Sequence, residues 1–195
     1  MKSSILKLIA EAVATINWNY VTLSRFRYGN KRRPAFRGAP HWHERPFAYE
    51  IYHRLRQRWS AERLERFCLV QAEVLKRYQE IEKMKKMPDI LFHAPNTERN
   101  LAVVEIKLAS NNSKPLSKDL NKLLLFQRIL HYEILVEIVI GTDQALVKTK
   151  AQLIRLSKNI RATIFVILLS LTDHRTSVVK ITKFRAYEIV PKSEG

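Results

Sequence analysis

The segment from Ala162 to Leu171 restricts the fold more than any other part of the chain, because it is nearly all apolar. A strand of this kind is typical of a sheet that is covered by helices on both faces. A second strand is predicted from Ile134 to Ile140, and Thr142 or Asp143 is predicted to cap a helix between the two strands that ends near Asn159. A strand, a helix and a strand in this order predict an α/β fold.

The upstream half of the chain also alternates between strand and helix patterns. Apolar periodicity predicts a helix over 46–59, strands over 67–75, 87–93 and 101–108, and a helix from a Ser117 cap to about 131. The strands on either side of the turn 94–100 are expected to form an antiparallel hairpin, and 113–117 is a polar break. Residues 177–190 are predicted to be one edge strand. These elements predict an α/β sandwich around a mixed sheet.

The first 45 residues differ from the rest in composition. Residues 1–17 have apolar side chains at helical spacing, which predicts an amphipathic helix (Ile5, Leu8, Ile9, Ala12, Val13 and Ile16). The segment 17–45 is a basic arm, with seven Lys and Arg residues, one acid, Glu44, and interleaved aromatic residues. These aromatics could stack on bases, or they could pin the arm onto the core. We therefore expect an N-terminal region, 1–45, and a main domain, 46–195.

The charge of the chain points to an anionic partner. There are 35 Lys and Arg residues against 18 Asp and Glu residues, a formal charge of +17, which suits nucleic acid, a membrane surface or an acidic protein. Four scattered glycines exclude the glycine clusters of P-loops and dinucleotide sites. The longest apolar run, 164–169, is far below the roughly 20 residues that span a bilayer. The single cysteine, Cys68, cannot form an internal disulfide, which suits a cytoplasmic location.

Candidate chemistry lies on the predicted hairpin. Because side chains alternate along a strand, Glu105 and Lys107 share one face, and Asp89 on the neighbouring strand is expected beside them. Two close carboxylates repel each other unless a cation lies between them, and hard oxygen ligands select Mg²⁺ or Mn²⁺. Such an ion with a nearby ammonium suits hydrolysis of a phosphodiester. The alternative is a solvated strand face with an incidental ion pair.

The same residues resemble a known motif. Pro88-Asp89, a gap of 15 residues and Glu105-Ile106-Lys107 resemble the PD-(D/E)XK signature of the restriction-endonuclease-like nuclease superfamily, over about 46–171. The resemblance implies a restriction-endonuclease-like core in which Asp89 and Glu105 bind the metal ion, the main-chain carbonyl of Ile106 completes the site, and Lys107 is the catalytic lysine.

Other site residues are less sharply indicated. Family members often add an acid on the first core helix, where Glu50 stands in this chain, although its position equally suits solvent exposure. The segment Asp119-x-x-Lys122-Leu123 is similar to segments that follow the motif in some members, so Lys122 could contact a phosphate or the active site. The alternative is an i, i+3 ion pair on a helix surface. Basic side chains are expected to hold the nucleic-acid backbone (Arg54, Arg58, Arg32, Arg33 and Arg37).

The sequence thus predicts a Mg²⁺- or Mn²⁺-dependent nuclease whose substrate is nucleic acid, with DNA favoured over RNA and membrane binding disfavoured. Two alternatives from other classes remain: a nucleic-acid-binding domain that keeps the fold without cutting, and a basic assembly protein in which the acidic pair is incidental. Formation of a homodimer is left open, and it would decide whether one or both strands are cut.

Overall fold

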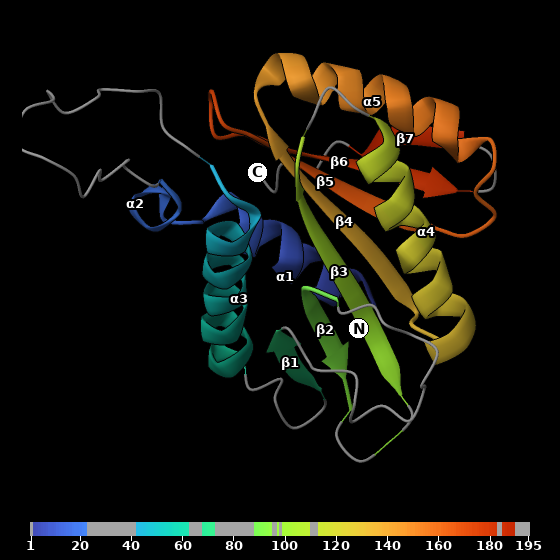
Figure 1. Ribbon diagram of the computed structural model, residues 1–195. Coiled ribbons are helices and arrows are strands. Elements are labelled where there is room, and N and C mark those ends of the chain that lie inside the picture. The colour runs from blue at the N-terminus through green and yellow to red at the C-terminus, as the bar shows by residue number, and fades with distance from the viewer. Residues whose placement is uncertain are drawn as a thin grey trace, which may run out of the picture.

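The structure is a computed structural model that describes residues 2–22, 42–62, 68–72, 88–94, 97, 99–109, 113–182 and 185–189. Within these residues the strands form one mixed sheet of seven, in the order β1 to β7 (Figure 1). The strands are β1 (Leu69–Ala72), β2 (Ile90–His93), β3 (Asn100–Leu108), β4 (Ile134–Gly141), β5 (Ile164–Ser170), β6 (Thr176–Thr182) and β7 (Arg185–Ile189). The three central strands, β3, β4 and β5, are parallel, and every other pair is antiparallel.

Helices cover both faces of the sheet, as the sequence predicts. The helices are α1 (Lys2–Ala14), α2 (Trp18–Val21), α3 (Glu44–Ala61), α4 (Ser113–Leu130) and α5 (Asp143–Ser157). One core lies between the sheet and α1 and α3, and a second core lies between the sheet and α4 and α5 (Figure 1). Because α4 and α5 connect successive parallel strands, their place on a common face fits right-handed crossovers. Among the described residues, no helix is long and apolar enough to cross a membrane.

The predicted apolar stripe of the first helix is confirmed. All six apolar residues of the predicted stripe are buried and belong to the core beneath α1 and α3. Five of them lie in α1, and Ile16 follows its end at Ala14. Burial of one apolar face, more than intrinsic helix propensity, stabilises a helix of this length. Helix α1 therefore packs on the sheet that the predicted main domain forms.

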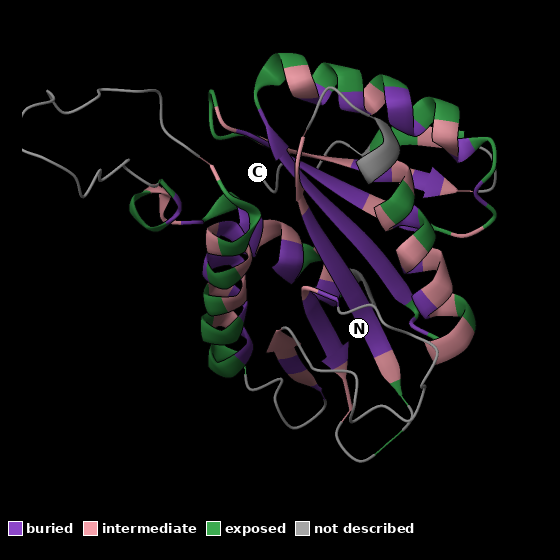
Figure 2. Cartoon of the chain, in the orientation of Figure 1, coloured by how far each residue is buried: buried purple, intermediate pink, exposed green. Residues whose placement is uncertain are grey.

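The two long central strands are also confirmed. All eight residues of β4 are buried, and six of the seven residues of β5 are buried, Phe165 being the exception (Figure 2). The helix between them begins after Thr142, whose hydroxyl oxygen accepts a hydrogen bond from the amide of Ala145 at 3.4 Å. The Thr142 alternative for this cap is therefore correct.

Two of the predicted boundaries are wrong. The expected single edge strand 177–190 is a hairpin of β6 and β7, in which Thr182 pairs with Arg185 across a two-residue connection. That connection carries none of the Gly, Asn, Asp or Pro signals from which a turn is recognised. The predicted polar break 113–117 is instead the first turn of α4, which begins at Ser113. Pro115 is compatible with a first turn because the amides there need no partner within the helix.

The basic arm is described only at its two ends. Trp18 and Trp42 pack edge to face with ring centroids 6.0 Å apart, and both rings pack against Phe47 of α3. For these two tryptophans the interpretation that aromatics pin the arm onto the core is correct. The helix α3 starts at Glu44, two residues before the predicted start, and an acid in the first turn is favourable to the helix dipole.

Candidate active site

The hairpin brings Asp89 and Glu105 together. Strands β2 and β3 pair so that Ile90 lies opposite Val104, and continuing this antiparallel register by one residue places Asp89 opposite Glu105. The Asp89 Oδ2 atom accepts a hydrogen bond of 2.7 Å from the amide of Ile106. Because the N–H and C=O of a strand residue point to the same neighbouring strand, the Ile106 carbonyl also faces the Asp89 side.

Helix α4 supplies two partners for the Glu105-x-Lys107 pair. Lys122 Nζ donates a hydrogen bond of 2.5 Å to Glu105 Oε2, and Lys107 Nζ lies 2.7 Å from Asp119 Oδ2. The side chains of Asp119 and Lys122 are only 16% and 15% exposed. The interpretation of Asp119-x-x-Lys122 as a pair on the helix surface is therefore wrong, because both side chains are turned toward the sheet.

Two acids near these residues were missed by sequence reasoning. Glu137 is fully buried on β4, directly beside Glu105 in the parallel register. Glu44 Oε1, from the first turn of α3, accepts a hydrogen bond of 3.2 Å from the amide of Leu108 and lies 3.8 Å from Lys107 Nζ. A signal was present for Glu137, since a single acid inside a long apolar strand is a buried polar group.

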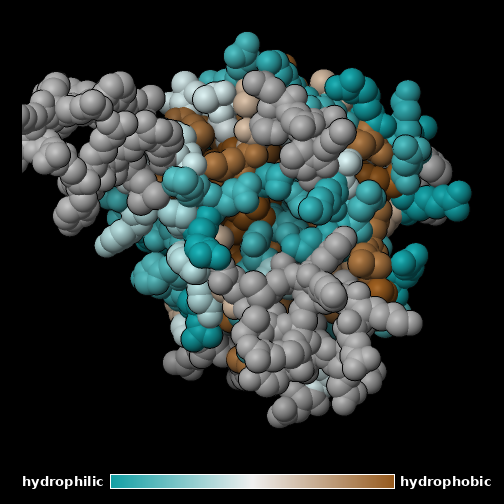
Figure 3. Space-filling view, in the orientation of Figure 1, coloured by the Kyte–Doolittle hydropathy of each residue, from teal (hydrophilic) through white to brown (hydrophobic). Residues whose placement is uncertain are grey.

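The six central residues form one electrostatic unit, which we call the acid–lysine cluster (Asp89, Glu105, Lys107, Asp119, Lys122 and Glu137). It combines four carboxyl groups with two ammonium groups. Fully ionised, it has two more negative than positive charges, inside a chain whose net charge is +17. Figure 3 shows polar residues gathered between α3 and α4, in the region that β3 crosses.

Burial is the main influence on the acids of the cluster. Desolvation raises the pKa of Asp89, and it raises the pKa of Glu105 to about 8, although the Lys122 charge opposes it at both residues. It also raises the pKa of Glu137 well above the ordinary value, with a further contribution from the charges of Asp119 and Glu105. Unpaired carboxylates lose hydration in such surroundings, so the acids favour a proton or a cation.

At Lys107 the neighbouring acids, and not burial, decide the direction of the pKa shift. Desolvation lowers the pKa of its ammonium group, but the hydrogen bond to Asp119 and the charges of Glu44, Asp119 and Glu137 outweigh it, so the pKa is raised overall. Lys107 therefore remains protonated at neutral pH. It can donate hydrogen bonds to an anion, and it is a poor general base.

Asp119 Oδ2 is buried and lies in an ion pair with Lys107, whereas three other carboxyl oxygens of the cluster are buried with neither a hydrogen bond nor an ion pair. They are Glu105 Oε1 and both carboxyl oxygens of Glu137. Carboxylate oxygens are the ligands that Mg²⁺ and Mn²⁺ prefer, so the donor set suits such an ion. Over the described ranges, no group of three His, Cys, Asp or Glu side chains already converges as a metal site.

Glu50 lies apart from this cluster, so the structure does not bring it to the other predicted site acids. It is 6% exposed, and its Oε1 atom accepts hydrogen bonds from the amide of Asn17 at 2.9 Å and from Arg54 Nε at 2.7 Å. Solvent exposure, the other interpretation of Glu50, is wrong. Glu50 ties the start of α2 to α3, and the acid of α3 that approaches Lys107 is Glu44.

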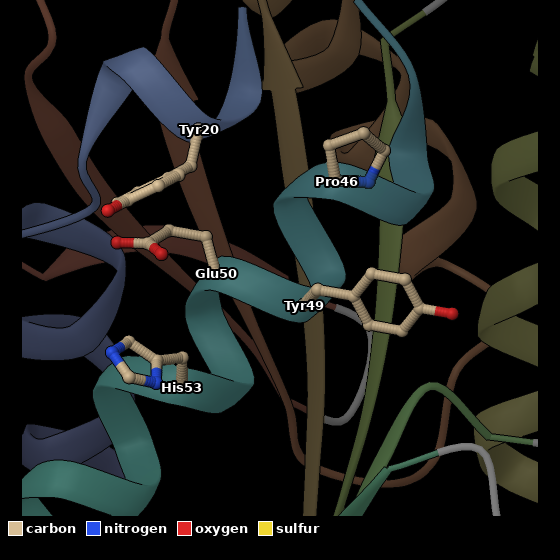
Figure 4. Close-up of a pocket in the computed structure, with 5 residues that line it drawn as sticks. All are labelled: Tyr20, Pro46, Tyr49, Glu50 and His53. Carbon is tan, nitrogen blue, oxygen red and sulfur yellow. The ribbon is translucent and has the colours of Figure 1, made fainter.

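A separate pocket of about 530 Å³ lies beside Glu50, lined also by Tyr20, Pro46, Tyr49 and His53. Figure 4 shows the Glu50 carboxyl group and the His53 ring pointing to the same side of α3 as Tyr20. Two of its lining side chains, Tyr20 and Tyr49, are large and exposed. None of the residues of the acid–lysine cluster lines this pocket.

The arginines that are predicted to bind the nucleic-acid backbone lie in different surroundings. Arg54 pairs with Glu50, and Arg58 Nη1 lies 2.8 Å from Glu11 Oε2 of α1. The Arg54 pair lies within α3, whereas the Arg58 pair joins α3 to α1, and the two arginine side chains are 28% and 35% exposed. The arm residues Arg32, Arg33 and Arg37 lie outside the described residues.

A scan against protein-family models found no match, and searches of curated proteins and of solved structures found no significant match.

Proposed function

We propose that this protein is a metal-dependent nuclease that hydrolyses phosphodiester bonds in DNA. The observation that carries the proposal is the registered pair of Asp89 and Glu105 on the β2–β3 hairpin, with Lys107 two residues further along the same strand face. Two acids and a lysine in this arrangement match the chemistry that a phosphodiester requires, which is a site for a cation beside a fixed positive charge.

Asp89 and Glu105, with the main-chain carbonyl of Ile106, are the groups that would hold Mg²⁺ or Mn²⁺. The buried, unpartnered Glu105 Oε1 atom supports this assignment, because an ion would satisfy it. The Ile106 amide holds the Asp89 carboxyl group in place at 2.7 Å. When bound, such an ion supplies polarisation of a phosphoryl oxygen and acidification of a water molecule.

Lys107 contributes a fixed positive charge. Asp119 at 2.7 Å and Glu44 at 3.8 Å hold its ammonium group, and both raise its pKa. A protonated lysine in this position would bind a phosphate oxygen and stabilise the charge that develops on it. A group held in advance loses little freedom when the substrate binds, which favours catalysis.

The surrounding elements support a restriction-endonuclease-like core as part of the proposal. A helix, α3, precedes the first strand, the β2–β3 hairpin carries the motif, and α4, β4 and α5 follow. Asp89 directly precedes β2, and Glu105 lies three residues before the carboxyl end of β3, the strand end at which open α/β sheets usually bind ligands.

DNA is proposed as the substrate because of the charge distribution. The chain has a net charge of +17, while its buried charges at the candidate site are mainly acidic. A basic molecule around a small acidic site suits a polyanion that is bound over a wide area and cut at one point. Binding to DNA should therefore weaken steeply as the salt concentration rises.

A cleavage assay tests the proposal. The purified protein is incubated with linear, nicked, branched and single-stranded DNA in Mg²⁺, in Mn²⁺ and in EDTA. We expect cleavage of at least one substrate with a metal ion and none in EDTA. Asp89→Asn, Glu105→Gln and Lys107→Ala should each lose about a hundredfold or more of the rate, whereas the surface variant Glu188→Gln should keep it.

The other outcomes separate the alternatives. Cleavage that persists unchanged in all three site variants would refute the site. Tight DNA binding without cleavage of any substrate would favour a nucleic-acid-binding domain, and absence of both binding and cleavage would favour an assembly protein.

A further inference from the structure

Glu137 is a buried acid that the proposed chemistry does not yet use. It is the one charged residue of β4, a strand whose residues are all buried. Its exposed fraction is 0%, and both carboxyl oxygens lack a hydrogen-bond partner in the described part of the chain. A valine or isoleucine would fill this position without the cost of burying a carboxyl group, which reaches several kcal/mol. The fold alone therefore does not account for Glu137.

The sheet places Glu137 in line with the two proposed metal-binding acids. In the parallel register of β3 and β4, Glu137 lies directly beside Glu105 on the same face. The antiparallel register of β2 and β3 puts Asp89 on the other side of Glu105. Neighbouring strands are about 4.8 Å apart, so the three acids form a row across three strands. Charges of Glu105 and Asp89 both act on Glu137.

We propose that Glu137 is a third carboxyl group of the divalent-cation site, beside Asp89 and Glu105. This inference rests on the proposed function and adds a residue to its site. Glu105 Oε1 and the two Glu137 oxygens are buried and unpartnered, on residues that lie side by side in the sheet. With all its groups ionised, the cluster has two negative charges in excess of its lysines, which is the charge that one Mg²⁺ or Mn²⁺ balances.

The lysines of the cluster do not serve in place of the ion. Lys107 Nζ is held by Asp119 and Lys122 Nζ by Glu105, so each ammonium group already has a carboxylate partner other than Glu137. Lys122 donates to Glu105 Oε2, whereas Glu105 Oε1 has no partner. Glu105 Oε1 is therefore the oxygen that an ion shared with Glu137 would contact.

Direct measurement of Mn²⁺ binding tests this inference without any activity assay. Calorimetric titration of the full-length protein with MnCl₂ gives a Kd for the wild type, Glu137→Gln, Glu137→Asp, Glu105→Gln and the surface control Glu188→Gln. Circular dichroism and a thermal melt establish that each variant is folded. Glu137→Asp keeps the charge with a shorter side chain, so it tests the site even if the glutamine variant unfolds.

We expect Glu137→Gln to raise the Kd for Mn²⁺ about tenfold or more, Glu137→Asp to raise it by less, and Glu188→Gln to leave it unchanged. If Glu105→Gln loses binding while both Glu137 variants keep the wild-type Kd within about twofold, Glu137 is not part of the site, although the proposed function stands. If the wild type binds no Mn²⁺, both proposals are refuted.

Discussion

Replacement of Glu105 by glutamine should change the pH dependence of stability more than any surface substitution. Burial raises the pKa of Glu105 in the folded protein from 4.5 to about 8, so the folded state binds this proton more tightly than the unfolded state. The free energy of unfolding must then fall as the pH rises from the unfolded pKa to the folded pKa. Each pH unit in this window costs about 1.4 kcal/mol.

Between pH 5 and pH 8 the loss from this one group is on the order of 4 kcal/mol, a large fraction of the stability of a typical domain. Glu105→Gln removes the titrating group. The difference between the unfolding free energies of wild type and variant should therefore fall by about this amount from pH 5 to pH 8. Subtracting the unfolding free energy of the variant from that of the wild type cancels the contributions of groups whose titration the substitution leaves unchanged.

Urea denaturation in EDTA, followed by circular dichroism at half-unit pH steps, measures this difference. Glu188→Gln is the matched control, because Glu188 also pairs with a lysine, Lys150 at 3.0 Å, but both side chains are well exposed. That surface pair should contribute less than about 1 kcal/mol, and its variant should keep the wild-type pH dependence. A difference curve for Glu105→Gln that is flat within about 1 kcal/mol would refute the burial argument.

Three further predictions follow from other contacts. Asp119→Asn removes the carboxylate partner of Lys107 and lowers the pKa of Lys107. The rate of DNA cleavage should therefore fall about tenfold, and the alkaline limb of the pH–rate profile should move to lower pH. An unchanged profile would contradict a positioning role for Asp119. Glu50→Gln should lower the free energy of unfolding by about 1 to 3 kcal/mol and leave the cleavage rate unchanged, and a loss of cleavage in a stable variant would return Glu50 to the site. Gly141→Ala places a Cβ atom 2.6 Å from the Cβ of Ala109. The free energy of unfolding should therefore fall by about 1 to 3 kcal/mol, which thermal denaturation should show as a lower Tm. An unchanged Tm would show that the chain at Gly141 and the chain at Ala109 can move apart.

Local patterns determined which residues share a face. Alternation along β3 predicted that Glu105 and Lys107 point the same way, and the turn between two apolar strands predicted the hairpin that brings Asp89 opposite Glu105. The helical spacing of the first helix predicted its buried side chains. These features depend on residues only a few positions apart, or on a short turn, so the sequence alone is sufficient to predict them.

Only the tertiary structure decided which further acids lie beside the predicted site residues. Glu137 lies 32 residues after Glu105, and its place beside Glu105 depends on the parallel register that the packing of α4 on β3 and β4 permits. Glu44 reaches Lys107 from the first turn of α3, which precedes the hairpin in the sequence, while Glu50, on the same helix, contacts the start of α2. These contacts between distant residues depend on how the apolar faces of the helices and strands pack across the whole sheet. Local periodicity in the sequence does not predict them.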